Sequence, residues 1–468
     1  MAPSEERNMP VPHEQPGGKE ERRQHQTPEQ HRKPEQRRTP EQRHSSADLA
    51  SSVKQISKKT TAHLDVLAAD EEASTGLKQD TEDDFVSNIE HPSLYRVVGK
   101  LGYGSTSTVW LCRNLQTQED YVALKVYINN SKTHRELSVC QHINSVSSQH
   151  PGREYVRKLL DSFEIEGPHG KHICLVFEPL GNSLGQLHLL ADGALDTEII
   201  RQAMRPILNA LQFLHDEAGV IHTDLQPNKI LLGIHDNAIL AKFEQDELQE
   251  PSARKELPGR TIYTSRPVWP TARGWPSLSD FSEARFGGSE HTDLVMPDVY
   301  RAPEVILDMP WSYPIDVWGF AMVIWDLVEP DRLFTARDEN GRYSEEHHLA
   351  QMVSVLGPPP QDFLQRSRKC EKYWDQNGEP GTTQQLGHAV ALTYETTGNW
   401  IGDVAIPDQS LAFKERRLSG NEKAHFLAFM RKMLQWKPED RSDWNDVFFS
   451  EWLVADLIES GHIGRDDD

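Results

Sequence analysis

Two different spacings of apolar residues divide this chain into a strand-rich part and a helix-rich part. From residue 95 onward, the apolar positions come in short runs of β-branched and aromatic side chains, at 95–98, 107–111 and 121–126. Runs of this kind, bounded by glycine and polar residues, are typical of strands with at least one buried face. We therefore predict a β-sheet within residues 93–180.

Beyond residue 181 the apolar residues repeat with the period of a helix. The clearest stretches are Ile200, Met204, Ile207, Leu208 and Leu211, and later Phe426, Phe429, Met430 and Met433. Residues three and four positions apart share one face of a helix. We predict the fold class α+β, bilobal, with a small β-rich lobe at 93–180 followed by a large α-helical lobe at 181–455.

The two ends of the chain lack either pattern. Residues 1–90 are rich in Gln, Glu, Arg, Pro and Ser and nearly free of aromatic residues, so they would bury too little apolar surface to offset chain entropy. We predict that 1–90 is disordered and that 456–468 is an acidic tail. Basic pairs at 22–23, 32–33 and 37–38 would suit nuclear import, or would belong to a merely solvated tail. The expected location is the cytoplasm and/or the nucleus.

Composition limits the classes of partner. The chain has 50 Lys and Arg against 72 Asp and Glu, a formal net charge of −22 at pH 7. This charge disfavours direct binding of nucleic acid and favours basic protein partners. Four widely separated cysteines without a C-x-x-C pair predict neither a disulfide framework nor a zinc site. No apolar run reaches the ~18–20 residues of a membrane span, so we expect an intracellular protein without membrane contact. No heptad pattern is sustained, which leaves the oligomeric state without a sequence signal, and our expectation is a monomer.

A glycine-rich turn and a lysine in the following strand form the first chemical motif. Residues 102–109 read G-x-G-x-x-S-x-V, and the backbone of such a turn can approach phosphates without a Cβ in the way. The tip of Lys125 can reach the same phosphates while its stem stays packed. Glu136 opens a segment of helical spacing and is the candidate partner of Lys125. Hairpin glycines and solvent-facing lysines are common, so neither feature alone identifies a function.

The most specific motif is HTDLQPNKILL at residues 222–232, which resembles the catalytic loop of protein kinases. Asp224 would orient a substrate hydroxyl and accept its proton. Residues 280–282 resemble the magnesium-binding D-F-G motif, and residues 302–304 contain the A-P-E motif intact. With the glycine turn and the strand lysine in order before them, these motifs identify the chain as resembling the eukaryotic protein kinases. That resemblance implies the bilobal protein-kinase fold, ATP and Mg²⁺.

The resemblance also implies which residues hold the nucleotide and the metal. Phe177 would be the gatekeeper, the backbone of Glu178 and Leu180 would face adenine, and Arg441 would pair with Glu304 inside the helical lobe. The implied nucleotide contacts are Leu101, Gly102, Tyr103, Gly104, Ser105, Ser107, Val109, Ala123, Lys125, Phe177, Glu178 and Leu180. The implied catalytic residues are Asp224, Lys125, Glu136 and Gln226, and the implied metal ligands are Asp280 and Asn228.

Among the kinases, the sequence is most similar to the SR-protein kinases, above all their fungal branch. The matching details are STVWL at 107–111, HTD at 222–224, HLA at 348–350 and LGPP at 356–359. This family has a spacer between the catalytic loop and the D-F-G motif, and here the two aspartates are 56 residues apart. We expect the spacer, about 243–276, to be loop-like with local packing.

The family resemblance implies serine/threonine protein kinase activity, in the class EC 2.7.11.1, toward basic Arg/Ser-rich proteins of the splicing-factor type. Substrates of this kind would be recognised through an acidic groove, and acidic charge speeds the encounter with basic peptides. The candidate groove residues are Asp331, Asp338, Glu339, Glu345 and Glu346. Each of them fits a solvated acidic face equally well.

Three positions depart from the pattern of a working kinase. Lys229 stands where the family has a second metal-binding asparagine, and an ammonium group has no lone pair for Mg²⁺. Asn228 would replace that ligand only if the loop rotates. Gln226 stands where most of these kinases have a lysine, which removes a charge but leaves an amide donor. Ser282 replaces the D-F-G glycine, where a positive φ would cost about 1–3 kcal/mol.

Thr223 replaces the arginine with which many kinases bind a phosphate on the activation segment. A threonine hydroxyl cannot form a bidentate phosphate pair, so we expect activity that does not depend on phosphorylation between Asp280 and Glu304. The departures leave a second, non-enzymatic hypothesis open, in which the fold is an ATP-binding or peptide-binding scaffold. A kinase of small molecules on a related fold is disfavoured by the intact segment 300–304 and the full helical lobe after it.

Overall fold

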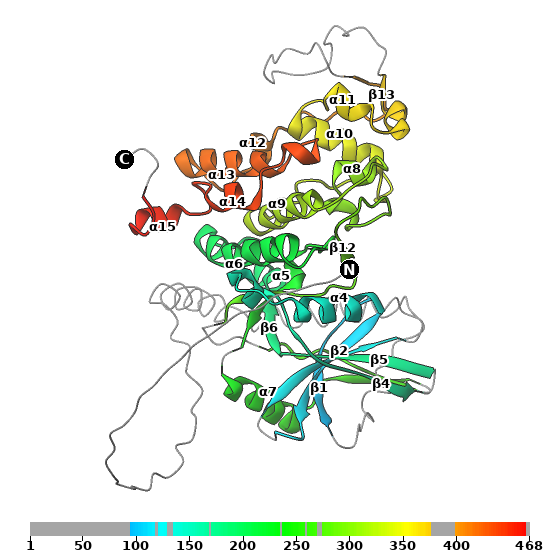
Figure 1. Cartoon of the computed structure of the whole chain (residues 1–468), viewed down its shortest axis with the longest axis vertical. Helices are drawn as coiled ribbons and strands as arrows, with labels where there is room; N and C mark the ends of the chain where they lie inside the picture. The colour runs from blue at the N-terminus through cyan, green and yellow to red at the C-terminus, as the bar shows by residue number, and fades with distance from the viewer. Residues whose placement is uncertain are drawn as a thin grey trace, which may run out of the picture. The chain divides into compact units, whose positions relative to one another are not determined.

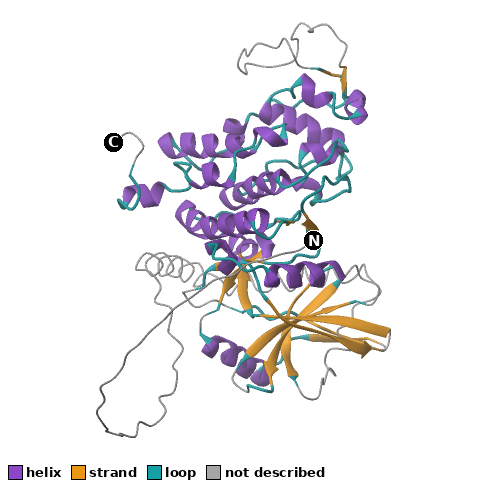
Figure 2. Cartoon of the chain, in the orientation of Figure 1, coloured by secondary structure: helices purple, strands orange, loops and turns teal. Residues whose placement is uncertain are grey.

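The computed structural model describes residues 94–117, 120–128, 134–167, 170–234, 236–257, 260–268, 274–375 and 398–464. The chain divides into two compact units, Met1–Pro40 and Glu41–Asp468, and every described residue belongs to the second. The segment predicted to be disordered, 1–90, and the last residues of the acidic tail lie outside the described residues. Figure 2 separates a strand-rich part from a helical part, which confirms the predicted fold class.

The strand-rich part is a five-stranded antiparallel sheet, against which one helix of its own and a helix of the spacer pack. Its strand order is β1-β2-β3-β5-β4. The elements are β1 (Tyr95–Tyr103), β2 (Ser107–Asn114), β3 (Tyr121–Tyr127), α4 (His134–Ser145), β4 (Leu159–Gly167) and β5 (Gly170–Phe177). Because side chains alternate along a strand, Ala123 of β3 joins the core shared with α4, whereas Leu124 and Val126 join a separate cluster on the other face. Lys125 has the parity of Ala123 and therefore points toward α4, where it contacts Glu136.

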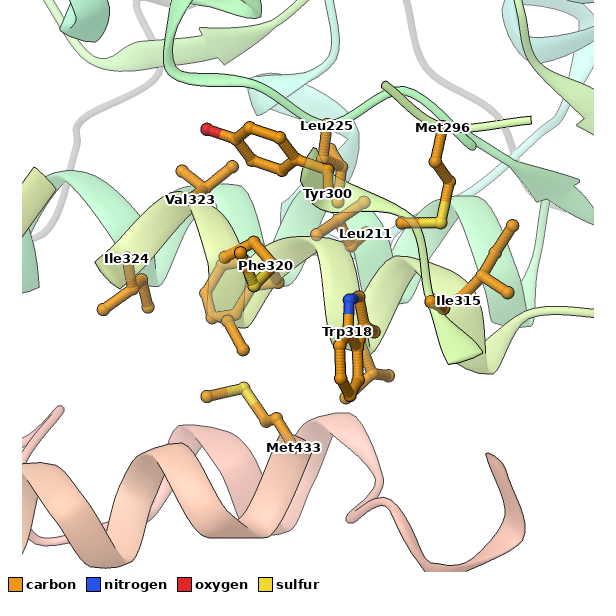
Figure 3. Close-up of a cluster of buried hydrophobic side chains, with 14 of the residues drawn as sticks. Leu211, Leu225, Met296, Tyr300, Ile315, Trp318, Phe320, Val323, Ile324 and Met433 are labelled. Carbon is orange, nitrogen blue, oxygen red and sulfur yellow. The ribbon is translucent and has the colours of Figure 1, made fainter. Parts of the chain in front are cut away.

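The helical part is built around α9 (Pro314–Val328), which is buried on nearly every side. Helices with apolar residues all round form the centre of a large domain. Trp318 and Phe320 of α9 pack with Leu211 from α6 (Thr197–Asp216) and Met433 from α13 (Gly420–Met433) in one core (Figure 3). The remaining helices of this part are α5 (Leu184–Leu190), α8 (Pro303–Ile306), α10 (Glu345–Leu356), α11 (Gln361–Leu364), α12 (Leu411–Lys414), α14 (Trp444–Phe448) and α15 (Ala455–Glu459).

Short β-sheets form within the connections between these helices. The three-stranded sheet β11-β8-β6 consists of β6 (Leu180–Ser183), β8 (Ile230–Gly233) and β11 (Pro276–Leu278). The two-stranded pairs are β7 (Val220–Ile221) with β12 (Arg285–Phe286), and β13 (Trp374–Asp375) with β14 (Asn399–Trp400). Because β8 follows residues 222–229 and β11 precedes residue 280, their pairing brings these two segments side by side.

The spacer, expected at about 243–276, is not loop-like over its first part, and that expectation was wrong for residues 243–249, 254–257 and 260–263. It folds into α7 (Asn237–Gln249) and a hairpin of β9 (Arg254–Leu257) and β10 (Arg260–Tyr263). α7 begins under the side-chain cap of Asp236 and lies beside β1 (Figure 1). Its apolar signal was short, because Leu240 and Phe243 are its only fully buried residues. They share one buried cluster with Leu111 and Tyr121 of the sheet.

The first residues of the predicted acidic tail also fold. Both guanidinium Nη atoms of Arg205 on α6 donate to the Asp456 carboxylate, at 2.6 and 2.8 Å. Arg205 also donates to the Leu453 carbonyl at 3.0 Å, so α15 is bound to α6. Among the described residues, no helix combines the length and the apolar character that a membrane crossing requires.

Candidate functional site

Lys125, Glu136 and Asp280 meet at the boundary between the sheet and the helical part. The Lys125 ammonium lies 2.8 Å from Glu136 Oε2 on α4 and 2.9 Å from Asp280 Oδ1. Burial alone would lower the pKa of Lys125, but the charges of Glu136 and Asp280 outweigh burial and raise that pKa above its usual value. The predicted pairing of Lys125 with Glu136 is confirmed, and the lysine is held as a permanent cation.

The backbone of the loop that carries Asp224 is held by hydrogen bonds to a buried carboxylate. Asp316 at the start of α9 accepts hydrogen bonds from the backbone N–H of His222 at 2.7 Å and of Thr223 at 2.8 Å. His215 on α6 contacts the same carboxylate at 2.9 Å. These bonds hold Thr223 at a φ of 66°, a left-handed conformation that a β-branched residue adopts only under constraint. The loop is therefore fixed before any ligand binds.

The Asp224 carboxylate is oriented by two neighbours in its own loop. Gln226 Nε2 donates to Asp224 Oδ1 at 2.7 Å, and the Lys229 ammonium forms an ion pair with Asp224 Oδ2. Lys229 also lies 3.0 Å from Asp280 Oδ2. Alternating charges thus run from Lys125 through Asp280 and Lys229 to Asp224, in a chain of direct contacts. Lys229 occupies the position between the two carboxylates.

Asp280 has the chemistry of a magnesium ligand. Burial works to raise the pKa of its carboxyl group, but Lys125 and Lys229 hold that pKa well below the usual value, so the group stays ionised. Its side chain remains 31% exposed. Mg²⁺ in phosphate-transferring sites binds one or two carboxylates together with substrate phosphates, and Asp280 fits one such ion. In the described part of the chain, no cluster of three or more His, Cys, Asp or Glu side chains is placed to hold a metal by itself.

The strain expected at Ser282 is not there. Asp280, two residues earlier, has the positive φ, of 67°, and Asp tolerates this conformation better than most residues. Ser282 is not among the described non-glycine residues with positive φ. Between the two, Phe281 is buried with its ring centroid 5.3 Å from that of His222. The segment therefore needs no glycine at position 282, and that departure carries no backbone cost.

A cavity of about 460 Å³ is lined by Lys125 and Asp280 from this chain of charges, whereas Asp224, Gln226 and Lys229 are not among its lining residues. Its predicted lining residues are Leu101, Gly102, Tyr103, Gly104, Ser107, Val109, Lys125, Phe177, Leu180, Glu136, Asp280 and Asn228. The predicted contacts Ser105, Ala123 and Glu178 are not in its lining: Ser105 is exposed in the glycine turn, Ala123 is fully buried, and Glu178 has an exposed side chain. The glycine turn is closed by a hydrogen bond from Gly104 N–H to the Ser107 carbonyl at 2.8 Å.

Asn228 is bound to α5 rather than to Asp280. Its Oδ1 accepts a hydrogen bond from Ser183 Oγ at 3.3 Å, and a Cβ on Gly185 would overlap that same oxygen. A rotated Asn228 would have to bind the same metal ion as the Asp280 carboxylate. In the structure, Lys229 contacts that carboxylate instead. A role of Asn228 as magnesium ligand stays a prediction, whereas its contact with α5 is a structural one.

Sequence reasoning missed several residues that line the cavity, among them Arg157, Pro267 and Val268. Arg157 lies just before β4, which begins at Leu159, so no strand alternation placed its side chain in advance. Pro267 and Val268 come from the end of the spacer, and no spacing rule connects them with a glycine turn more than 150 residues earlier.

Arg441 and Glu304 form a bidentate ion pair in the core of the helical part. Both Nη–Oε distances are 2.7 Å, and the side chains are 0% and 1% exposed. Arg441 also donates to the carbonyls of Pro314 at 3.0 Å and Gln435 at 3.2 Å. The implied pairing of these two residues is confirmed, and it ties α8 to both α9 and the end of α13.

Comparison with known proteins agrees with this geometry. Residues 95–453 match the family model described as the protein kinase domain. A serine/threonine protein kinase of Aspergillus fumigatus is 41% identical over 371 residues, which cover 78% of this chain and 85% of that relative. The serine/threonine-protein kinase SRPK of Physarum polycephalum is 31% identical over 378 residues, 76% of this chain and 85% of the relative.

The protein kinase dsk1 of Schizosaccharomyces pombe is 25% identical over 531 residues, covering 90% of this chain and 94% of that relative. The predicted resemblance to the SR-protein kinases is confirmed, because kinases with that name or of fungal origin match most of the described residues. The chain belongs to the protein kinase family, within which it is an SRPK-like serine/threonine protein kinase.

Proposed function

We propose that this chain transfers the γ-phosphoryl group of ATP to serine or threonine hydroxyls of basic, Arg/Ser-rich proteins. The observation that carries the proposal is the chain of contacts from Lys125 through Asp280 and Lys229 to Asp224, beside a cavity with a glycine turn. It combines a phosphate-binding cation, a metal-binding carboxylate and a base within a few ångströms. Phosphoryl transfer needs this combination of positioning and charge.

Asp224 is the residue that would handle the substrate hydroxyl. Its Oδ1 is fixed by the Gln226 amide, and the backbone around it is fixed by Asp316. A carboxylate that is already oriented loses little freedom when a hydroxyl hydrogen-bonds to it, and it accepts the proton as the new P–O bond forms. Gln226 therefore acts as a positioning residue for Asp224.

Lys229 would supply part of the positive charge that a second metal ion supplies in related kinases. Burial alone would lower the pKa of Lys229, but Asp280 and Asp224 raise it above its usual value, so its charge is permanent. When bound at Asp280, Mg²⁺ would neutralise charge on the phosphate oxygens. A fixed ammonium beside Asp280 disfavours a second divalent ion through like-charge repulsion. We therefore infer a kinase that works with one magnesium ion.

The Lys229→Asn variant should gain dependence on a second magnesium ion. Because an amide oxygen can ligate Mg²⁺ where the ammonium cannot, we expect the rate to rise more steeply with Mg²⁺ concentration than in the native protein. Titration of Mg²⁺ against phosphate transfer at saturating ATP measures this. The matched control is Lys242→Asn, in which a 71% exposed lysine on α7 is changed. A Mg²⁺ profile that both variants share with the native protein contradicts the one-metal hypothesis.

The activation segment is held by contacts that need no phosphate. Thr223 Oγ1 donates to the Glu283 carbonyl at 2.6 Å. Arg285 binds the Asp293 carboxylate through Nε at 3.0 Å and Nη2 at 2.6 Å, and Trp311 Nε1 donates to the Asp293 carbonyl at 2.9 Å. Arginine, the usual binder of a regulatory phosphate, is here already paired with a carboxylate.

Phosphatase treatment should therefore leave the specific activity unchanged. The phosphate content of residues 280–304 before and after treatment is measured by mass spectrometry, together with the initial rate on an Arg/Ser-repeat peptide. We expect equal rates for both preparations, because the hydrogen bond from Thr223 Oγ1 to the Glu283 carbonyl is present in each. A collapse of the rate after phosphate is removed from this segment would show that the Thr223–Glu283 hydrogen bond is not sufficient to keep the segment in its active conformation.

Support for Arg/Ser-rich substrates comes from charge and from the relatives. The chain's net charge is −22, and one relative carries the name SRPK. Of the five candidate groove residues, Asp331 is near Arg416 at 3.6 Å, and Glu345 pairs with Lys369 at 3.0 Å. A basic peptide has to compete with these cations. We further propose that the kinase acts as a monomer in the cytoplasm and/or the nucleus.

Because Lys229 stands where related kinases have a metal-binding asparagine, one alternative function is also favoured. In it, the chain is a scaffold that binds nucleotide and peptide without turnover. The experiment that separates the two is incorporation of labelled phosphate from Mg-ATP into an Arg/Ser-repeat peptide, with nucleotide binding followed by thermal stabilisation. Labelling by the native protein supports the kinase. Stabilisation by ATP without labelling, with labelling restored by Lys229→Asn, supports the scaffold and overturns the proposed transfer.

A further inference from the structure

The last part of the spacer is bound to β1, the strand that leads into the glycine turn. The backbone N–H of Arg266 donates to the Lys100 carbonyl at 2.9 Å. The Lys100 ammonium donates to the Tyr263 carbonyl at 3.0 Å, and it lies 5.0 Å from the ring centroid of Tyr103 in the glycine turn. Hydrogen bonds in both directions therefore join residues 263–266 to β1.

The same segment is also held by α7. Arg266 Nε lies 2.6 Å from Glu247 Oε2 on that helix. Phe243 of α7 packs so closely on β1 that a Cβ on Gly99 would lie 2.9 Å from its ring. These contacts fix residue 266 between α7 and β1, two positions before Val268.

The two residues that follow this fixed point reach the nucleotide cavity. Pro267 and Val268 both line it. Val268 is 6% exposed and belongs to the buried cluster that includes Leu240 and Phe243 of α7. Leu101, which packs against this cluster, also lines the cavity. The spacer thus adds apolar side chains to the cavity wall that β1 provides.

Apolar side chains of this kind match the base and ribose of a nucleotide rather than its phosphates. The phosphates need positive charge, which Lys125 supplies in this cavity. The faces of a purine base are apolar and gain free energy when apolar side chains shield them from water. Leu101 is one of the nucleotide contacts that the family resemblance implies, and Val268 shares a buried cluster with the residues behind it.

We propose that Pro267 and Val268 contact the nucleoside part of ATP, so that the end of the spacer is a component of the nucleotide site. The inference rests on the proposed function, because it takes this cavity to be the nucleotide site. The spacer then contributes to the affinity for ATP. By thermodynamic linkage, bound ATP strengthens the attachment of the spacer to β1 by the same factor.

An ordinary packing role for Val268 makes a different prediction. If Val268 only completes the cluster beside α7, any loss of apolar contact in that cluster should weaken nucleotide binding alike. If Val268 contacts the nucleoside, only a residue in the cavity wall has this effect. The matched control is Ile239→Ala, because Ile239 of α7 packs against the same cluster but is not among the residues that line the cavity.

The experiment is calorimetric titration of the full chain with Mg-ATP and with adenosine, on the native protein, Val268→Ala and Ile239→Ala. Each buried CH₂ group that loses its contact weakens binding about fourfold. Val268→Ala removes two methyl groups, so we expect Kd to rise about 4- to 15-fold. The factor should be the same for ATP and adenosine, because the contact is made to the part that both share. Ile239→Ala should leave both constants unchanged.

The outcomes separate this inference from the function on which it rests. An unchanged Kd in Val268→Ala, or equal weakening by Val268→Ala and Ile239→Ala, overturns the inference and leaves the kinase proposal standing. A rise in Kd for ATP but not for adenosine also overturns it, because the contact would then be to the phosphates. Absence of binding of either ligand to the native protein overturns the proposed function together with the inference.

Hydrogen exchange in the native protein tests the same contact without any variant, and it decides the matter even if Val268→Ala does not fold. We expect saturating Mg-ATP to slow the exchange of backbone amides in residues 261–268, where the Arg266 N–H is bound to β1. The amides of α15, which is bound to α6, serve as the control and should not change. Unchanged exchange in 261–268, in a sample that binds Mg-ATP, overturns the inference.

Discussion

The Asp224→Asn variant should lose phosphate transfer by about 10²- to 10⁴-fold, the range that a general base contributes, while it still binds Mg-ATP. The amide keeps the shape of the carboxylate and can still be held by Gln226, but it has no charge with which to accept the proton of the substrate hydroxyl. Lys229 keeps its second partner, Asp280, at 3.0 Å, so the cavity retains its charge pattern. The measurement pairs initial rates of peptide labelling with a nucleotide dissociation constant.

The control is Asp216→Asn at the exposed end of α6, a change of the same chemistry outside the site. It should label peptide at the native rate. Labelling at the native rate by Asp224→Asn itself would contradict the assignment of the base. A loss of labelling accompanied by an equal loss of nucleotide binding would point instead to a collapsed loop and would equally contradict it.

The parts of the site that could be predicted from sequence are those whose chemistry leaves a local signature. Lys125 was placed in a strand, and Glu136, one of two acidic residues in the stretch before the next strand, was named as its candidate partner. The order of Lys125, Asp224 and Asp280 indicated one site, although pairing of β8 with β11 was needed to bring the last two together. Arg441 and Glu304 were paired through resemblance, and the contact was confirmed.

The parts that were missed depend on partners far away in the sequence. α7 is stabilised by strands 120 and more residues earlier: Glu244 accepts hydrogen bonds from Arg113 at 3.1 Å and from Tyr121 at 2.6 Å. A helix with only two fully buried residues has a narrow apolar stripe, so its hydrophobic pattern was weak, and most helix stability comes from such packing. Lys229 was recognised as a lost metal ligand, but its contact with two carboxylates required the folded loop.

The Arg441→Met variant should be the most destabilising single change considered, by about 3–5 kcal/mol, the usual cost of removing one partner from a buried ion pair. Methionine keeps most of the volume against Trp318, over whose ring the guanidinium lies at 5.3 Å, so the loss is not one of packing. The Glu304 carboxylate, 1% exposed, would be left without a counter-ion. We expect a lower midpoint in chemical denaturation, followed by fluorescence of the buried tryptophans.

The matched control is Arg366→Met, which removes a partner of Glu439 on the surface, where the two side chains are 35% and 54% exposed. An exposed pair of this kind contributes below about 1 kcal/mol. The double variant Arg441→Met with Glu304→Met should regain part of the loss, because it removes the unpaired charge. It should not regain all of it, since the carbonyls of Pro314 and Gln435 also lose their donor. Equal effects of Arg441→Met and Arg366→Met would show that burial of the pair does not matter to the stability of the fold.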